Sequence, residues 1–215
     1  MFTEALNPAN LASEIQKALG MSGAPSKELI GEATAICDEV LKALVSFAPG
    51  AIVGVAPPTG GQLTLGAGTG GTISGMTGSS LANDMKTQMN KPKISKQLQA
   101  VADAIVSHTM TGLVEFAPNM ILAACSNTAT SPGAVTGLIS TGGQISGLSG
   151  QPLSALMAEA FGGKVSPQLL KMCDAITNHI MSNSITGFVA AQVVGTASAG
   201  GGPIAAGAGV GGTIT

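Results

Sequence analysis

The hydrophobic residues of this chain repeat with helical spacing in three places about seventy residues apart. Apolar side chains recur every fourth residue within residues 11–19, 81–89 and 153–161. Side chains at this spacing share one face of a helix, so we predict a short amphipathic helix in each place. A residue type that tolerates left-handed backbone follows each one, which is typical of a helix end. These residues are Gly20, Asn90 and Gly162.

A longer helix is predicted after each short one. Each longer helix begins at a serine whose hydroxyl can accept hydrogen bonds from the free N–H groups of the first turn, namely Ser26, Ser95 and Ser166. The apolar stripe runs to about Leu44 in the first of them. Matching anchors follow, Phe47-Ala-Pro49 and Phe116-Ala-Pro118, with residues 187–190 in the third place. We interpret the prolines as the end of the helix or of the turn after it.

Short β-branched segments come next, and Gly, Thr and Ser dominate beyond them. Residues 66–74, Gly-Ala-Gly-Thr-Gly-Gly-Thr-Ile-Ser, match residues 207–215, and residues 141–146 carry a related motif. This composition alone is compatible with a disordered linker. A linker has no reason to repeat such a motif, so we predict extended strands packed so closely that only glycine fits.

These patterns predict an α+β fold of three tandem repeats of about 70 residues, at 1–78, 79–150 and 151–215, the last slightly truncated. Each repeat holds a short helix, a longer amphipathic helix and an extended Gly/Thr-rich β region. Repeats of this kind bury their apolar faces against their neighbours. We therefore expect them to pack about a pseudo-threefold axis or in a linear array.

Charged residues are scarce and unevenly placed. They make up 9% of the chain, and the segments 43–83, 116–158 and 175–215 contain none; roughly 25% is usual in soluble domains. Centres of protein interfaces exclude charge, so we expect identical copies or other proteins to cover these segments, with lipid contact as the less favoured cover. Glycine and proline interrupt every apolar run before the roughly 20 residues that a transmembrane helix needs, which argues against a simple membrane span.

Composition also bears on partners and compartment. A net charge of −2, no arginine and 2% aromatic residues argue against a nucleic-acid partner. Three cysteines are an odd number and do not suggest a disulfide framework. The first residues lack a secretory signal pattern, so we expect synthesis and use from the cytoplasm.

Two cysteine–aspartate pairs are candidates for chemistry, Cys37-Asp38 and Cys173-Asp174, and Ala102-Asp103 is the third copy of the pattern. Because alanine replaces cysteine there, we favour small buried core residues over a nucleophile or a metal ligand. The aspartates are interpreted as helix-surface charges. The ten methionines are interpreted as flexible core residues, with a docking surface as the alternative.

His108 and His179 each stand five residues after the aspartate of this pattern, and Ala43 stands at the equivalent place in the first repeat. Two such histidines could meet at an axis and bind a metal, but no cysteine or carboxylate stands at a ligand spacing. A polar helix surface is therefore favoured. The glycine string 66–71 lacks the lysine of a phosphate loop. We predict no catalytic, cofactor-binding or metal-binding residues, and hence no enzyme.

The Ala-rich segment 102–108, the Val/Ile-rich exit and the Gly/Thr-rich tail at 69–74 together resemble small virion proteins of tailed bacteriophages. The resemblance implies a structural component of the tail, neck or baseplate, located in the virion and in contact with other particle proteins. Two alternatives stay open: a membrane-active pore or ejection protein, and a Gly/Thr-rich adhesin-like surface protein.

Overall fold

The computed structural model describes residues 6–140, 143–182 and 192–214. These residues form two compact units, one of helices and one of strands, so the predicted α+β class is confirmed. The chain alternates between the units, and each of the segments 1–78, 79–150 and 151–215 contributes to both. The helical unit takes residues 1–42, 75–112 and 147–183, and the strand unit takes residues 43–74, 113–146 and 184–215.

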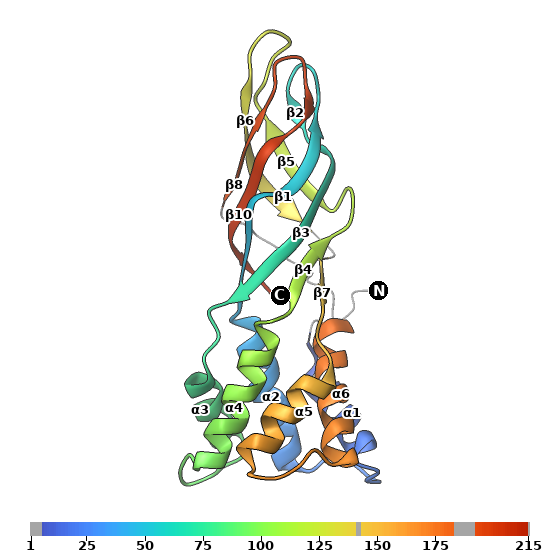
Figure 1. Ribbon diagram of the computed structural model, residues 1–215, viewed down its shortest axis with the longest axis vertical. Coiled ribbons are helices and arrows are strands. Elements are labelled where there is room, and N and C mark those ends of the chain that lie inside the picture. The colour runs from blue at the N-terminus through green and yellow to red at the C-terminus, as the bar shows by residue number, and fades with distance from the viewer. Residues whose placement is uncertain (1–5, 141–142, 183–191, 215) are drawn as a thin grey trace. The chain divides into compact units, whose positions relative to one another are not determined.

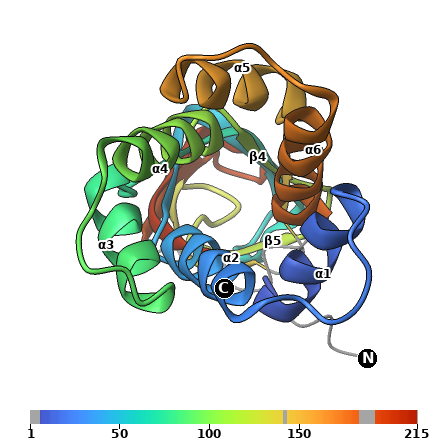
Figure 2. The ribbon, with the colours of Figure 1, turned by 90° about the horizontal axis from the view of Figure 1, so that it is seen from below.

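The helical unit contains six helices among the described residues (Figure 1). They are α1 (Pro8–Ala18), α2 (Lys27–Leu41), α3 (Gly78–Gln88), α4 (Lys96–Thr109), α5 (Gly150–Ala160) and α6 (Pro167–Ser182). Each helix packs against the next one along the chain, and α6 also packs against α1. The six helices therefore form a closed ring, as Figure 2 shows.

The predicted helix boundaries are confirmed at the start of each longer helix and after each short one. The side-chain oxygens of Ser26, Ser95 and Ser166 each accept a hydrogen bond from the backbone N–H three residues later, at 3.0 to 3.2 Å. The residues predicted to be left-handed have φ angles of 70°, 52° and 66°, at Gly20, Asn90 and Gly162 respectively.

The first of the longer helices ends earlier than predicted. Helix α2 stops at Leu41, and Leu44 opens strand β1 (Leu44–Ala56), which contains Phe47 and Pro49. Our interpretation of this proline as the end of a helix or its turn is wrong, because exposed and buried residues alternate from Leu44 with the period of a strand. Pro49 falls where β1 has no registered partner in either neighbouring strand, a place that tolerates a missing N–H.

The second predicted anchor differs in the same way. Phe116 ends strand β4, and Pro118 lies in the turn that follows it. The third anchor, residues 187–190, lies outside the described residues.

The strand unit is a curled antiparallel sheet. Its hydrogen-bonded order is β2-β5-β6-β8-β10-β1-β3-β4-β7, and β9 pairs with β1. Along the chain, Leu63 alone separates β2 from β3. In the sheet, β2 is the first strand of this order and β3 stands near its other end. The other strands are β2 (Gly61–Gln62), β3 (Thr64–Ser74), β4 (Leu113–Phe116), β5 (Ile121–Cys125), β6 (Gly133–Ser140), β7 (Gln144–Ser146), β8 (Gln192–Ala197), β9 (Gly202–Pro203) and β10 (Ala205–Thr213).

Two buried phenylalanines lie at the core of this sheet, and glycines make room for them. The rings of Phe47 and Phe116 are 5.8 Å apart between centroids. A Cβ atom on Gly71 would lie 2.5 Å from the Phe47 ring, and one on Gly143 would lie 2.5 Å from the Phe116 ring. The prediction that strands pack where only glycine fits is confirmed at these two positions.

Candidate functional surface and pocket

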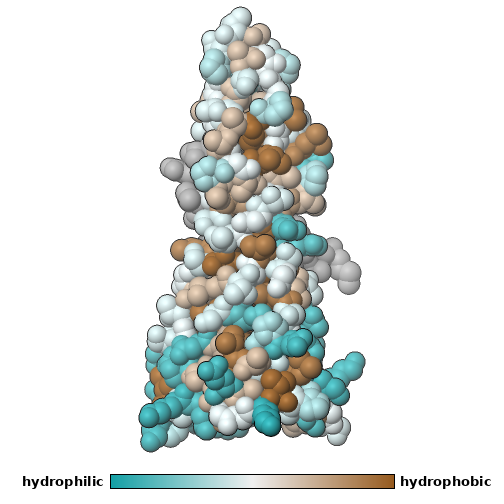
Figure 3. Space-filling model, viewed as in Figure 1, coloured by the Kyte–Doolittle hydropathy of each residue, from teal (hydrophilic) through white to brown (hydrophobic). Residues whose placement is uncertain are grey.

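The strand unit carries almost no charge. Glu115 is the one charged residue in its sequence, and every other Asp, Glu and Lys belongs to the helical unit. Figure 3 shows the consequence for one face of each unit, since strongly hydrophilic residues gather over the helices and pale or apolar residues over the strands. The two units therefore present chemically different surfaces.

Apolar side chains are exposed on the outer face of the strands. Val53 in β1, Leu65 in β3 and Leu122 in β5 are all exposed, and Leu122 lies between the buried residues Ile121 and Ala123. A sheet with one buried face usually places polar side chains on the other face. This outer face instead combines apolar side chains with glycine and threonine, a composition closer to the centre of a protein interface.

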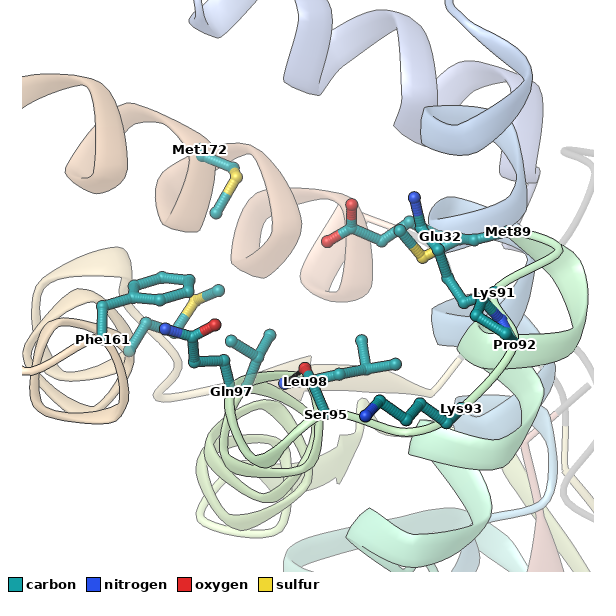
Figure 4. Close-up of a pocket in the computed structure, with 12 residues that line it drawn as sticks. Glu32, Met89, Lys91, Pro92, Lys93, Ser95, Gln97, Leu98, Phe161 and Met172 are labelled. Atoms are coloured by element: carbon teal, nitrogen blue, oxygen red, sulfur yellow. Dashed lines mark hydrogen bonds between the residues drawn. The ribbon is translucent and has the colours of Figure 1, made fainter.

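The helical unit contains a partly open pocket of about 520 Å³. Apolar side chains on α4, α5 and α6, and at the C-terminal ends of α3 and α5, form most of its wall. They are Met89, Leu98, Val101, Met157, Phe161 and Met172. Glu32 of α2 also lines the pocket, and in Figure 4 its carboxylate points toward the side formed by Met172 and Phe161.

Glu32 stands where an apolar residue would be expected. It is the sixth residue after the capping Ser26, and the sixth residues after the other two capping serines are Val101 and Met172, which line the same pocket. Within the described part of the chain, Glu32 has no hydrogen bond or ion pair, and burial raises the pKa of its carboxyl. Glu32 was not among the residues predicted from the sequence, although its distance from the serine cap places a charge at a position that is apolar in the other two helices.

The same count groups three buried polar residues. The thirteenth residues after the capping serines are Glu39, His108 and His179, which are 2%, 5% and 4% exposed. The prediction that both histidines lie on a polar helix surface is therefore wrong. Counting from the serine caps, the residue equivalent to the two histidines is Glu39 and not Ala43 as predicted.

Glu39 anchors one helical hairpin to the next. Its two carboxylate oxygens accept hydrogen bonds from the Thr77 N–H at 2.9 Å and from the Ser80 hydroxyl at 2.7 Å. Thr77 is the N-cap of α3, where free N–H groups and the helix dipole favour an anion. The Lys42 ammonium, 3.2 Å away, balances the charge.

The two histidines have comparable neighbours. Burial lowers the pKa of His108, and a hydrogen bond to the backbone of Ser149, the N-cap residue of α5, partly opposes this. The Nδ1 atom of His179 lies 3.0 Å from a carboxylate oxygen of Glu14 in α1. These contacts give both histidines a structural role at helix junctions.

The cysteines have the environment predicted for core residues. Cys37, Cys125 and Cys173 are buried free thiols, and burial raises the pKa of Cys37 and of Cys173 to about 12. A thiol with such a pKa stays protonated at neutral pH and is a poor nucleophile or metal ligand. Asp38 and Asp103 are exposed, as expected for helix-surface charges, whereas Asp174 is half-buried.

Metal ligands and membrane-spanning helices bear on the remaining candidate functions. No group of three or more His, Cys, Asp or Glu side chains within residues 6–140, 143–182 and 192–214 is arranged to hold a metal ion. None of the helices in those ranges has the length and apolar character required to cross a membrane.

Comparison with known proteins leaves function to be argued from these features. No family model, curated protein or solved structure matches the chain. The strand surface and the helical pocket are therefore the two features from which a role is inferred.

Proposed function

We propose that this protein is a non-catalytic structural subunit that assembles with identical copies, and with other proteins of a large particle, through its strand unit. The observation that carries the proposal is the separation of charge, with Glu115 alone in the strand unit. The proposed contact surface consists of those parts of the uncharged segments 43–83, 116–158 and 175–215 that belong to the strand unit.

The energetics of association favour this surface over the helical one. Burying apolar area yields about 25 cal/mol per Å², and the exposed side chains of Val53, Leu65 and Leu122 offer such area. Burying an unpaired charge would cost several kcal/mol, roughly cancelling the gain from a few apolar side chains. The strand unit avoids this cost almost entirely, since partners meet only Glu115.

We further propose that the chain is built of three tandem repeats about a pseudo-threefold axis. Support comes from the three short helices α1, α3 and α5, which are each 11 residues long. It also comes from the matching serine caps and from the ring of three helical hairpins. Such a chain would suit a particle whose own symmetry includes a threefold axis.

The particle we propose is a tailed-phage virion, with the protein in its tail, neck or baseplate region. This step rests on the resemblance of residues 102–108 and 69–74 to small virion proteins of that class. Peptides of the chain should then be found in purified particles, in a fixed ratio to the other particle proteins. Their absence from intact particles would contradict the location without affecting the assembly proposal.

Sedimentation velocity of the purified chain over a wide concentration range tests the assembly role. A species much heavier than the 20.9 kDa monomer, growing with concentration, is the expected result. A monomer at every concentration would overturn the proposal. Liposome flotation and dye release address the pore alternative, because a structural subunit leaves vesicles intact.

A further inference from the structure

We propose that the pocket of the helical unit is a binding site for an organic ammonium ion with an apolar body, and that Glu32 pairs with the ammonium group. This inference is independent of assembly through the strands, because every residue of the pocket belongs to the helical unit. It concerns a site for which the structural role of the chain has no use.

Glu32 is a half-buried carboxylate with no hydrogen-bond or ion-pair partner in the described part of the protein. A carboxylate that is half-buried among apolar side chains loses part of its hydration, and burial indeed raises its pKa. Glu39 of the same helix shows the usual solution, since it is paired with Lys42 and accepts two further hydrogen bonds. Glu32 lacks all of these contacts, although it points into a cavity large enough for a ligand.

The fold does not require an acid at the position of Glu32. Val101 and Met172 occupy the corresponding places on α4 and α6 and line the same pocket. An apolar residue therefore satisfies the local geometry in two of the three helices. The carboxylate of Glu32 on α2 therefore places a negative charge at one wall of a mostly apolar pocket.

The size and lining of the pocket indicate the kind of ligand. The volume of about 520 Å³ falls within the range of roughly 300–1,000 Å³ that small-molecule pockets occupy. Met89, Met157 and Phe161 suit an apolar body, because flexible thioethers fill irregular space and an aromatic ring offers a large apolar face. The carboxylate suits a cationic head group and repels an anion.

Two lysines at the pocket do not reverse this preference. Lys91 is held by Glu28, with 2.7 Å between its ammonium and a carboxylate oxygen. Lys93 is not joined to Glu32 by an ion pair in the described structure. An anionic ligand would gain Lys93 alone and would meet the unpaired Glu32.

Calorimetric titration with 4-phenylbutylammonium tests the proposal, with 4-phenylbutanol and 4-phenylbutanoate as probes of similar shape and different charge. A charged hydrogen bond contributes about 1.5–3 kcal/mol, so the ammonium should bind at least about tenfold more tightly than the alcohol. The carboxylate should bind most weakly. Shifts of the methionine methyl resonances of Met89, Met157 and Met172 would place the probe in the pocket.

Two variants complete the test. Glu32→Gln keeps the shape of the side chain and should abolish the preference for the ammonium over the alcohol. Lys93→Gln should keep or increase it, because it removes a like charge from the site. No ammonium binding at millimolar concentration, equal binding of the three probes, or an unchanged preference in Glu32→Gln would each overturn the proposal. Thermal unfolding of each variant verifies that the fold is retained.

Discussion

Replacing Gly71 by alanine tests whether the strand unit is held together by close packing around its phenylalanines. The new Cβ would lie 2.5 Å from Cζ, 2.7 Å from Cε1 and 3.0 Å from Cε2 of Phe47. Carbon atoms in contact prefer about 3.5–4.0 Å, so the ring must move by about 1 Å. Phe47 is buried and packs on Phe116, which leaves it little room to move.

The expected cost follows from these distances. Overpacking a core typically costs about 1–3 kcal/mol, and alanine recovers about 0.4–1 kcal/mol through lower chain entropy in the unfolded state. We therefore expect Gly71→Ala to lower the free energy of unfolding by about 1–2 kcal/mol. Urea denaturation followed by circular dichroism measures the change, and hydrogen exchange of the strand amides locates it.

Gly195→Ala is the matched control in the same sheet. Its new Cβ would have no neighbour closer than 3.4 Å, so the free energy of unfolding should change by less than about 0.5 kcal/mol. Gly71→Ala in a Phe47→Leu background should also lose most of its effect, because leucine lacks the ring atoms that clash. Equal stabilities for Gly71→Ala and Gly195→Ala would refute the packing explanation.

Three further substitutions have expected outcomes that urea denaturation can check. Glu32→Gln should stabilise the protein at neutral pH by up to about 1 kcal/mol, since burial raises the folded-state pKa of the half-buried carboxyl and disfavours its charged form. This gain should fade as pH falls through the folded-state pKa toward about 4.3. Burial lowers the folded-state pKa of His108, so stability should be lost as pH falls below about 6.5, and His108→Gln should reduce this loss. Leu65 is 54% exposed with φ of 54°, so Leu65→Gly should be more stable than Leu65→Ala by about 1 kcal/mol. A pH-independent gain in Glu32→Gln, an unchanged slope in His108→Gln, or a more stable Leu65→Ala would each contradict the corresponding explanation.

Local signals in the sequence predicted the helix ends, because those depend on neighbouring residues. The hydroxyl of Ser26 caps α2 and Gly20 follows α1 in left-handed conformation, and both effects act over one helical turn. The switch from helix to strand at Leu44 was missed. Apolar residues there fit the helical stripe and the strand alternation equally well, and pairing with distant strands decides between them.

Non-local contacts explain what the sequence did not reveal about the sheet. Leu44 pairs with Thr213 and with Ser74, partners that lie 169 and 30 residues away along the chain. No periodicity in one segment encodes such a register, although the glycine motifs indicated that extended segments pack closely. The strand order therefore could not be derived from the pattern alone.

The candidate site was missed for a different reason. Glu32 and Glu39 lie in one amphipathic helix, where acidic residues usually face water. Alignment on the three capping serines shows that the residues equivalent to Glu32 in the other two helices are apolar. It also shows that the residues equivalent to Glu39 are buried histidines. The serine caps give that register, whereas the Cys-Asp pattern used for the histidines shifted it by four residues.

The most direct test of assembly through the strand unit compares two matched leucine substitutions by sedimentation velocity. Leu122 in β5 is 40% exposed and Leu156 in α5 is 39% exposed, so Leu122→Lys and Leu156→Lys add the same charge at equal exposure in different units. The account predicts that the wild-type protein and Leu156→Lys associate, while Leu122→Lys sediments as a folded 20.9 kDa monomer. Association of Leu122→Lys to the same extent as the wild-type protein would contradict it.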